Sequence, residues 1–498
     1  MKYKTKGKKR NNEENINRVL NRISNIIYSY RMLIILSYLV LIVIFFSVQF
    51  HLLQNWDMLS RVLNANFLFH NGNYFEDQRA PLENLLIGIF SLFLGGYAVY
   101  AFIALSTLIF FLSLSAFSDA FNIKLLVLVL IVFNPFFLFY SMKNGSELLL
   151  FSFLIFYVSS IKKRDPLSGL FLALAFLSKY DALFFSPLLL FMLRKDLRSI
   201  RNFFLAIIAF LTTLTPYFVY NFSVFHNSIY PLAKSFIENS GSGLIPSISG
   251  NLEKYGWLGL YELIPIAVIT SFIIIFEGKY LRKILKDRSK ILDVSILSLS
   301  VIISIYIYLA VGHLFTEGIG VYRFFLGISL FLTLLLALFT KKVDITWLLP
   351  FAAASFMIAV IMLNTVYPVA LSNQNLLRMG ISAFSSIYNT TNCTVESNEW
   401  VPLNYYGLSA TYIRNDTPSL PIVNFYGPIN TTLPLRYDKN EIYIYGGQKC
   451  VYIPPVDLPG GYYNDVNLSK ADPALACRWL FDSKIKSSLL LDTCEYLT

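Results

Sequence analysis

Charged side chains are scarce in this 498-residue chain. Asp, Glu, Lys and Arg together make up 14% of it, whereas hydrophobic residues make up 56% and aromatic residues 16%. Soluble domains average about 25% charged residues. The chain therefore has too few ionic groups to cover the roughly three soluble domains that its length would allow, and it is too apolar to be disordered. The composition predicts an α-helical polytopic membrane protein.

The excess of positive charge does not indicate a nucleic-acid binder. The formal net charge is +11, and such a value on one face of a globule would attract nucleic acid. Here, however, the basic residues lie in loops between apolar runs and form no continuous basic face. We expect membrane lipids as neighbours and no nucleic-acid partner.

Apolar runs without charge recur through the first three quarters of the chain. Many are long enough to cross about 30 Å of hydrocarbon, and they predict about eleven transmembrane helices. The runs at 167–179 and 181–193 are interpreted as two half-length helices, because the basic clusters at 162–164 and 194–201 then both face the cytosol. The expected spans are 32–50, 97–117, 124–142, 147–161, 167–179, 181–193, 202–221, 257–276, 291–312, 324–340 and 345–367.

Lys and Arg are divided unequally between the two sets of loops. Of the 41 in the chain, 25 lie in segments assigned to the cytosol and seven lie in the loops of the opposite face. The positive-inside rule therefore places the N-terminus in the cytosol and the C-terminus outside. Residues 1–31 are Lys-rich and continue into an amphipathic pattern, which predicts a helix on the inner membrane surface. Residues 32–367 form the expected transmembrane domain.

Residues 368–498 differ in composition from the rest and predict a small mixed α/β domain outside the cell. They contain all four cysteines and five Asn-x-Ser/Thr acceptors, which fit an oxidising compartment with a glycosylation machinery. Three disulfide pairings are open, and zinc is the weaker alternative because no Cys-x-x-Cys spacing occurs. The residues are Cys393, Cys450, Cys477, Cys494, Asn389, Asn392, Asn415, Asn430 and Asn467.

Ionisable residues close to the outer membrane edge are the candidates for chemistry, because charge in or near hydrocarbon is costly and tends to be functional. Asp57 and Arg79 lie in the first outer loop, Glu147 and Lys179 in the next two outer turns, and Arg323 before the tenth span. We expect these five to converge on one pocket. Further residues expected near it are Tyr74, Asp77, Tyr180, Asp181, Glu262, His313, Glu317 and Tyr322.

Each of these residues also has a purely structural alternative. Asp57 is alternatively a solvated loop carboxylate, and Arg79 an anchor to lipid headgroups. Glu147 alternatively stabilises the N-terminus of the helix that it opens. Lys179 alternatively forms a local ion pair, and His313 is alternatively a satisfied interfacial histidine.

Short motifs in the outer loops follow one another in a recognisable order. They are Asp57, Leu63-Asn64-Ala65-Asn66-Phe67-Leu68, Gly72, Tyr74, Arg79-Ala80-Pro81-Leu82, Asn134-Pro135 through Tyr140-Ser141 to Glu147, Gly169-Leu170 with Leu177-Ser178-Lys179-Tyr180, and Tyr322-Arg323. In this order the sequence resembles the GT-C superfamily of glycosyltransferases, nearest to the protein-O-mannosyltransferase and aminoarabinose-transferase type. The resemblance covers roughly residues 30–340. The double-Trp-Asp motif of oligosaccharyltransferases is absent, which disfavours transfer to asparagine.

The resemblance implies inverting transfer of a sugar from a polyprenyl-phosphate donor of the dolichyl-phosphate type to a hydroxyl acceptor on the outer face. In that mechanism Asp57 is the general base, with Glu147 as second choice. Arg79, Lys179 and Arg323 bind the donor phosphate. A divalent cation, Mg or Mn, is a candidate cofactor with Asp57 and Glu147 as candidate ligands. The acceptor is a glycan, a protein or a lipid.

Two other function classes compete with the transferase. A transporter or flippase of lipid-linked sugar also uses broken helices and membrane charges, although the charges here cluster at outer turns and no internal duplication is visible. A membrane-anchored surface assembly protein would instead have its function in residues 368–498.

Overall fold

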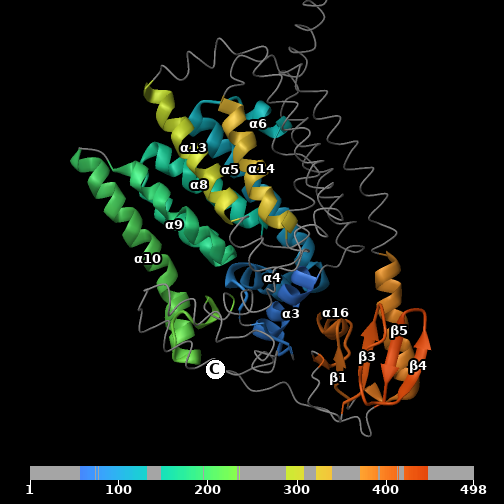
Figure 1. Ribbon diagram of the computed structural model, residues 1–498. Coiled ribbons are helices and arrows are strands. Elements are labelled where there is room, and N and C mark those ends of the chain that lie inside the picture. Colours follow the sequence, from blue (N-terminus) through green and yellow to red (C-terminus); the bar gives the residue numbers. More distant parts are fainter. Residues whose placement is uncertain are drawn as a thin grey trace, which may run out of the picture.

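The computed structural model shows apolar helices standing side by side and a small sheet beyond one end of them (Figure 1). The expected cytosolic segment 1–31 and the expected spans 32–50, 257–276 and 345–367 lie outside the residues that the structure describes. The described residues are 56–72, 74–76, 78–131, 147–193, 196–232, 235, 288–307, 321–338, 371–390, 393–411, 413 and 420–446.

The helical part confirms a membrane protein with several apolar helices. Three helical stretches in the described part are long and apolar enough to cross a membrane: Pro81–Phe121, Leu197–Phe225 and Lys290–Ile307. The total of about eleven spans stays a prediction. The helices are α3 (Trp56–His70), α4 (Pro81–Leu94), η1 (Gly95–Tyr97), α5 (Ala98–Phe121), α6 (Leu125–Ile131), α8 (Glu147–Lys163), α9 (Leu167–Ser178), η2 (Tyr180–Met192), α10 (Leu197–Phe225), α13 (Arg288–Ile307) and α14 (Val321–Ala337).

The two expected half-length helices are separate and run antiparallel. The backbone of Lys179 is extended between them (φ −161°, ψ 131°). Ser168 Oγ, at the start of α9, lies 3.2 Å from Met192 Sδ, at the end of η2. The second element is a 3-10 helix, where the sequence predicted an α-helix. Pro187 inside it has no N–H to donate, and the Tyr157 hydroxyl donates to the Phe185 carbonyl (3.0 Å).

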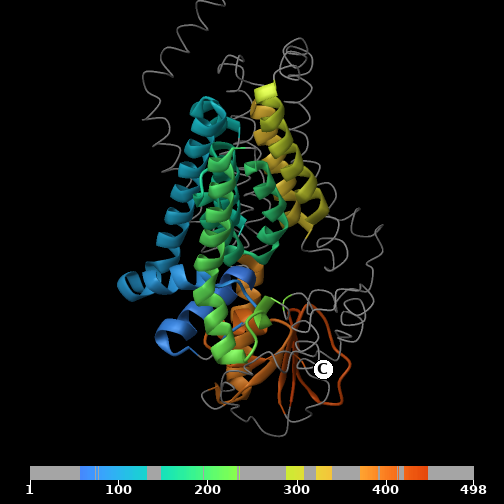
Figure 2. The same cartoon turned by 90° about the vertical axis from the view of Figure 1, so that its left-hand side faces the viewer.

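Helix α4 lies crosswise to α5, as Figure 2 shows. The chain turns between them at Gly95, whose φ of +52° is easily adopted only by glycine. Pro81 occupies the first turn of α4, where a missing N–H costs nothing. The outward face of α4 exposes large apolar side chains, including Ile89 and Phe93. This geometry suits a helix lying along the membrane edge.

Helix α10 extends further than the predicted span 202–221. It begins after Asp196, whose carboxylate accepts a hydrogen bond from the backbone N–H of Ser199 (3.0 Å) and so caps the helix. Pro216 lies inside α10 without ending it. The helix therefore continues beyond the apolar run at both ends.

The C-terminal part is a mixed five-stranded sheet with helices, as the sequence predicted for an α/β domain. The strand order is β2-β1-β3-β5-β4. Strand β1 is parallel to both β2 and β3, whereas β5 is antiparallel to β3 and β4. A helix over 371–387 packs Leu377 and Phe384 against the sheet. The remaining elements are β1 (Val395–Ser397), α16 (Trp400–Tyr405), β2 (Ala410–Thr411), β3 (Ile422–Phe425), β4 (Leu435–Lys439) and β5 (Ile442–Tyr445).

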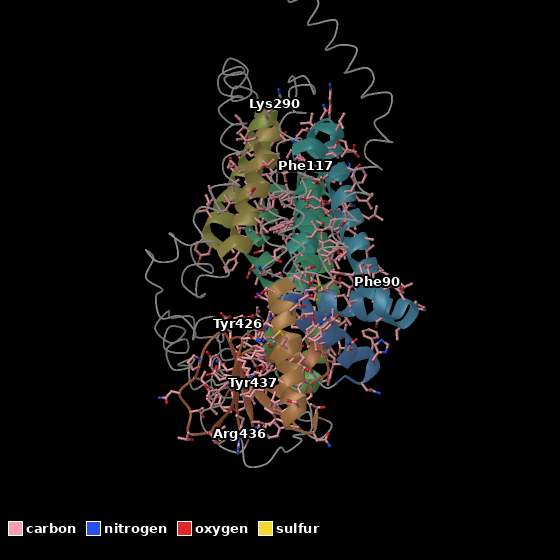
Figure 3. All side chains as sticks on the ribbon, turned by 90° about the vertical axis from the view of Figure 1, so that its right-hand side faces the viewer. Phe90, Phe117, Lys290, Tyr426, Arg436 and Tyr437 are labelled. Carbon is pink, nitrogen blue, oxygen red and sulfur yellow. The ribbon has the colours of Figure 1, made fainter. Side chains whose placement is uncertain are left out.

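The sheet and the basic residues Lys162 and Lys290 lie at opposite ends of the helices. Figure 3 shows Lys290 at one end and Arg436 and Tyr437 of the sheet at the other. Near the Lys290 end, Lys162 pairs with Asp293. This separation is what the charge-based topology predicts, since basic loops and the C-terminal domain are expected on opposite faces.

Helices α9 and α10 approach so closely that one glycine decides their packing. A Cβ atom built on Gly169 would lie 1.7 Å from the backbone oxygen of Ala206. Gly169→Ala is therefore expected to lower the apparent Tm in detergent by several degrees, because overpacking costs about 1–3 kcal/mol. Gly96→Ala is the matched control, since no atom lies within 4 Å of its Cβ position. An equal Tm for both variants would contradict the close contact.

Candidate active site

The loop between α3 and α4 folds back over α3 and is fixed there by Asn64. The Asn64 side chain donates to the Glu76 carbonyl (2.8 Å), and its oxygen accepts from the Glu76 backbone N–H (2.7 Å). Asn64 is fully buried. Asp57 stands in the first turn of α3, where a carboxylate is stabilised by the helix dipole. Asn64 thus brings the loop that carries Arg79 back towards Asp57.

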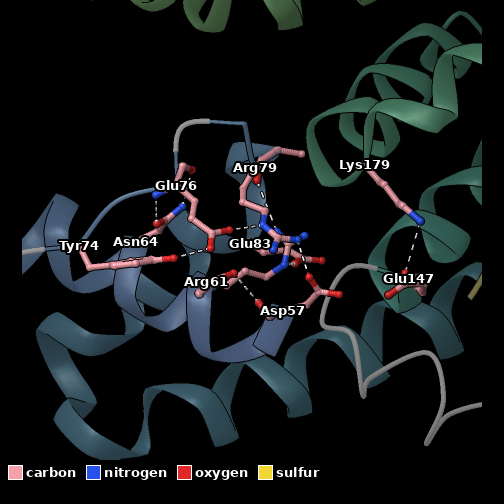
Figure 4. A network of polar contacts seen from close by, with 11 residues as sticks. Asp57, Arg61, Asn64, Tyr74, Glu76, Arg79, Glu83, Glu147 and Lys179 are labelled. Atoms are coloured by element: carbon pink, nitrogen blue, oxygen red, sulfur yellow. Dashed lines mark hydrogen bonds and ion pairs between the residues drawn. The ribbon is translucent and has the colours of Figure 1, made fainter. Parts of the chain in front are cut away.

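Arg79 bridges two carboxylates, one from α3 and one from the loop (Figure 4). Its Nη1 lies 2.5 Å from Asp57 Oδ1, and its Nε lies 2.5 Å from Glu76 Oε2. The Tyr74 hydroxyl donates to the other oxygen of Glu76 (2.5 Å). The Glu76 side chain is fully buried, whereas those of Asp57 and Arg79 are 14% and 19% exposed. The buried Glu76, itself held by Tyr74, thus fixes the position of the Arg79 guanidinium. The Asp57–Arg79 pair is partly exposed to solvent.

A second ion pair, Arg61 with Glu83, lies buried near the first. Arg61 Nε is 2.7 Å from Glu83 Oε2, with side chains 5% and 0% exposed. The N–H is not aligned for a hydrogen bond, so this is a close ion pair held by charge. Glu83 also lies within electrostatic range of Asp57, Glu147 and Lys179. Sequence analysis missed Glu83, although it is the one charged residue in the apolar α4.

The other half of the site comes from α8 and α9. Glu147 is the first residue of α8 and is fully buried. Lys179 ends α9, and its Nζ lies 3.4 Å from Glu147 Oε1 and 3.2 Å from Asp181 Oδ2. The electrostatic reach of Glu83 to both halves places them in one group of charges. The structure thus brings together four of the five expected residues.

Several expected residues lie elsewhere or outside the described part. The Tyr180 hydroxyl lies 2.5 Å from the Tyr217 hydroxyl of α10. Arg323 and Tyr322 belong to α14, but the structure does not describe their side chains. The residues that lie outside the described part are Asp77, Glu262, His313 and Glu317.

Carboxyl groups outnumber cations around these contacts in the described part of the chain. The cations are Arg61, Arg79 and Lys179, and the carboxyl groups are those of Asp57, Glu76, Glu83, Glu147 and Asp181. Each cation faces at least one of them. An anionic group that enters here must therefore compete with carboxylates for Arg79 or Lys179.

The described residues do not form a ready metal site. No group of three His, Cys, Asp or Glu side chains among them is arranged to hold a metal ion. Asp57 already faces Arg79, and Glu147 faces Lys179. The two candidate ligands thus have cationic partners from the protein itself.

Helix α16 of the C-terminal part packs on α3 next to this site. The ring of Trp400 lies edge-on to that of Trp56, with centroids 4.3 Å apart. Burial raises the pKa of Glu399, which precedes α16, to about 7. Burial also raises the pKa of Tyr405, with smaller contributions from Tyr406 and Tyr100. Sequence analysis did not predict α16, because six residues are too few to show helical periodicity.

The expected modification sites are only partly described. Cys393 is buried and disulfide-bonded. Asn389 and Asn430 are exposed, as a glycosylation acceptor must be. The members of this set outside the described residues are Cys450, Cys477, Cys494, Asn392, Asn415 and Asn467.

The Arg61–Glu83 pair gives a test of how the site is held. Arg61→Met alone is expected to destabilise the protein by about 3–5 kcal/mol, because it leaves a buried carboxylate without its cation. Adding Glu83→Leu is expected to recover most of that loss, as measured by the apparent Tm. Arg164→Met, which breaks the more exposed pair with Asp196, is the control and should change stability by at most about 1 kcal/mol. A double variant less stable than either single one would contradict the pairing.

One family model matches the sequence. It is that of glycosyltransferase family 87, and it matches residues 80–304. The match begins just after Arg79 and includes Glu83, Glu147 and Lys179. No curated protein and no solved structure matches the chain significantly.

The family match agrees with the resemblance to GT-C enzymes, the apolar helices and the charged site at one end of them. The match also indicates that the chain is an enzyme, and not the transporter or the surface assembly protein that the sequence left as alternatives. The chain matches glycosyltransferase family 87 over residues 80–304 and is a GT-C-type integral membrane glycosyltransferase that depends on a lipid-phosphate sugar.

Proposed function

We propose that this glycosyltransferase moves a sugar from a polyprenyl phosphate to a hydroxyl acceptor at the outer membrane face, with inversion of the anomeric carbon. The observation that carries the proposal is the Asp57–Arg79 pair, 2.5 Å apart and partly exposed. It combines an acid suited to accept a proton with a guanidinium suited to bind phosphate. The sheet domain at the same end of the helices is then extracytoplasmic.

Asp57 is the proposed general base. As the acceptor oxygen bonds to the anomeric carbon, its proton passes to the Asp57 carboxylate, and the bond between that carbon and the phosphate oxygen breaks. A positioned carboxylate contributes typically 10²–10⁴-fold to such a step. Glu147 is the second candidate, but it is fully buried and faces Lys179. That position suits it better to orient groups than to take the proton.

Arg79 and Lys179 are the proposed phosphate ligands, with Arg323 as a further candidate from α14. The leaving phosphate takes the electron pair of the broken bond and gains negative charge. Fixed cations stabilise this gain more than they stabilise the bound donor, which is what lowers the barrier. An Arg fork also donates parallel bonds to phosphate oxygens.

An exchange of partners at Arg79 links donor binding to the base. In the structure, Arg79 is shared between Asp57 and the buried Glu76. When the donor phosphate binds Arg79, it competes with the Asp57 carboxylate, while Glu76 keeps Nε in place. Asp57 is then released towards the acceptor hydroxyl. Binding of the donor thus makes the Asp57 carboxylate available as the base. When the acceptor binds without the donor, the Asp57 carboxylate is still paired with Arg79.

Asp57→Asn tests the assignment of the base. The amide cannot accept the proton, so transfer is expected to fall by at least about 10²-fold, while the protein folds normally. The measurement is the rate of sugar transfer by the purified enzyme, together with mass spectrometry of surface glycans and lipid-linked sugars in cells. The donor should accumulate there, and the glycan should lack one residue.

Asp438→Asn is the matched control, because Asp438 is an exposed aspartate on β4. It should transfer at the rate of the unchanged enzyme. Undiminished transfer by Asp57→Asn would remove Asp57 as the base.

Arg79→Lys tests the proposed phosphate contact. The substitution keeps the charge but loses the fork, and one charge-assisted hydrogen bond is worth about 1.5–3 kcal/mol. We therefore expect kcat/KM for the lipid-phosphate sugar to fall by about 10–100-fold. Arg436→Lys, at an exposed arginine of the sheet, is the control. If both variants kept the original kcat/KM, the role of Arg79 would be wrong.

A further inference from the structure

The sheet domain reaches the transferase site through one short helix, α16. Two contacts matter, one next to Asp57 and one that leads to Arg79. The first is the edge-on packing of Trp400 against Trp56, with ring centroids 4.3 Å apart. Trp56 directly precedes Asp57 and begins α3. The position of this indole therefore helps to fix the first turn of α3, which carries the acid.

The second contact supports the guanidinium. Val401 is fully buried in a cluster with Leu59, Leu63 and Tyr74. The Tyr74 hydroxyl donates to Glu76, and Glu76 holds Nε of Arg79. The packing of α16 against Tyr74 thus helps to fix the position of Arg79, through the hydrogen bond from Tyr74 to Glu76 and the one from Arg79 to Glu76. The same helix backs both members of the ion pair.

Helix α16 is itself fixed to the sheet at both ends. Near its start, the Asn398 side chain donates to the Phe425 carbonyl and accepts from the Phe425 N–H, both at 3.0 Å. Near its end, the Asn404 side chain donates to the Ala410 carbonyl (2.7 Å). These bonds tie α16 to β3 and β2. A helix held in this way presents Trp400 and Val401 at defined positions.

We propose that α16 is a positioning element of the transferase: it sets the distance between the Asp57 carboxylate and the Arg79 guanidinium without touching either substrate. Through Trp400 the sheet domain is therefore required for turnover, and through Val401 it also supports the donor ligand Arg79. This inference rests on the proposed role of Asp57 as base. Misplacement of a reacting group by about 1 Å can cost 10²-fold in rate, so a small shift of α3 is enough to matter.

Trp400→Ala in the full-length enzyme is the main test. Removing the indole leaves Trp56 without its partner ring, so kcat is expected to fall by at least about tenfold. KM for the lipid-phosphate sugar should change by less than about twofold, because the phosphate ligands remain. Trp400→Phe keeps an aromatic ring against Trp56 and should restore most of kcat. With kcat expressed per folded enzyme, loss of stability alone would leave kcat unchanged.

A double-mutant cycle with Trp56→Ala sharpens the test. If both indoles act through their mutual contact, the double variant should lose no more of kcat than the worse single variant. Leu435→Ala is the control within the same domain, because Leu435 is half-exposed on β4, the edge strand opposite β2. If Trp400→Ala does not fold, Val401→Ala replaces it. Because Val401 packs beside Tyr74, which supports Arg79 through Glu76, this variant should lower kcat and also raise KM for the lipid-phosphate sugar.

The outcomes separate this inference from the proposed function. A kcat for Trp400→Ala or Val401→Ala within twofold of the unchanged enzyme would overturn the positioning role, as would an equal loss in Leu435→Ala. If Asp57→Asn is inactive in that case, only the inference about α16 fails. If Asp57→Asn is fully active, the proposed base fails, and with it the reason for positioning it.

Discussion

The need to pair every charge at the membrane edge governs this structure. An isolated ion out of water is costly, and a buried pair is tolerated only when geometry and further hydrogen bonds compensate both members. Glu76, Glu83 and Glu147 are fully buried, and each faces an Arg or a Lys. These contacts join α3 to α4 and α8 to the end of α9, and Glu83 lies within electrostatic range of the second pair. The requirement for charge pairing therefore also fixes how the ends of these helices near the sheet domain meet.

The interruptions of the helices also bring helix ends and charged residues together at one end of the bundle. Gly95 lets the chain turn from the crosswise α4 into α5, and the extended Lys179 separates α9 from η2. Each break delivers a charged residue or a helix end to the same end of the bundle. A set of unbroken spans would place such residues at separate loop tips. The combination of acidic and basic side chains that the proposed chemistry needs thus depends on the positions at which the helices end.

The region matched to glycosyltransferase family 87 is only one part of the site. It begins at residue 80, so Asp57 and Arg79 lie just before it, and the sheet domain lies well beyond it. These outer parts contact one another through Trp56 and Trp400. The phosphate side of the proposed mechanism rests partly on the matched region, through Lys179, whereas the base and its support come from outside it. The proposed phosphate ligands therefore come both from the matched region, with Lys179, and from the loop before it, with Arg79.

The sequence by itself determined the class of fold and the candidate pair. Long uncharged runs, the bias of Lys and Arg, and the presence of Asp57 and Arg79 between the first two apolar runs are local properties, and local patterns are visible in a sequence. The sequence predicted a loop at Asp57, whereas the structure places it in the first turn of α3. The pairing of Glu83 with Arg61, the support of Arg79 by Glu76, and the contact of α16 were decided only by the tertiary structure. They join segments without a shared period or spacing, and strands of two or three residues show no alternation. Only folding decides which buried charges meet.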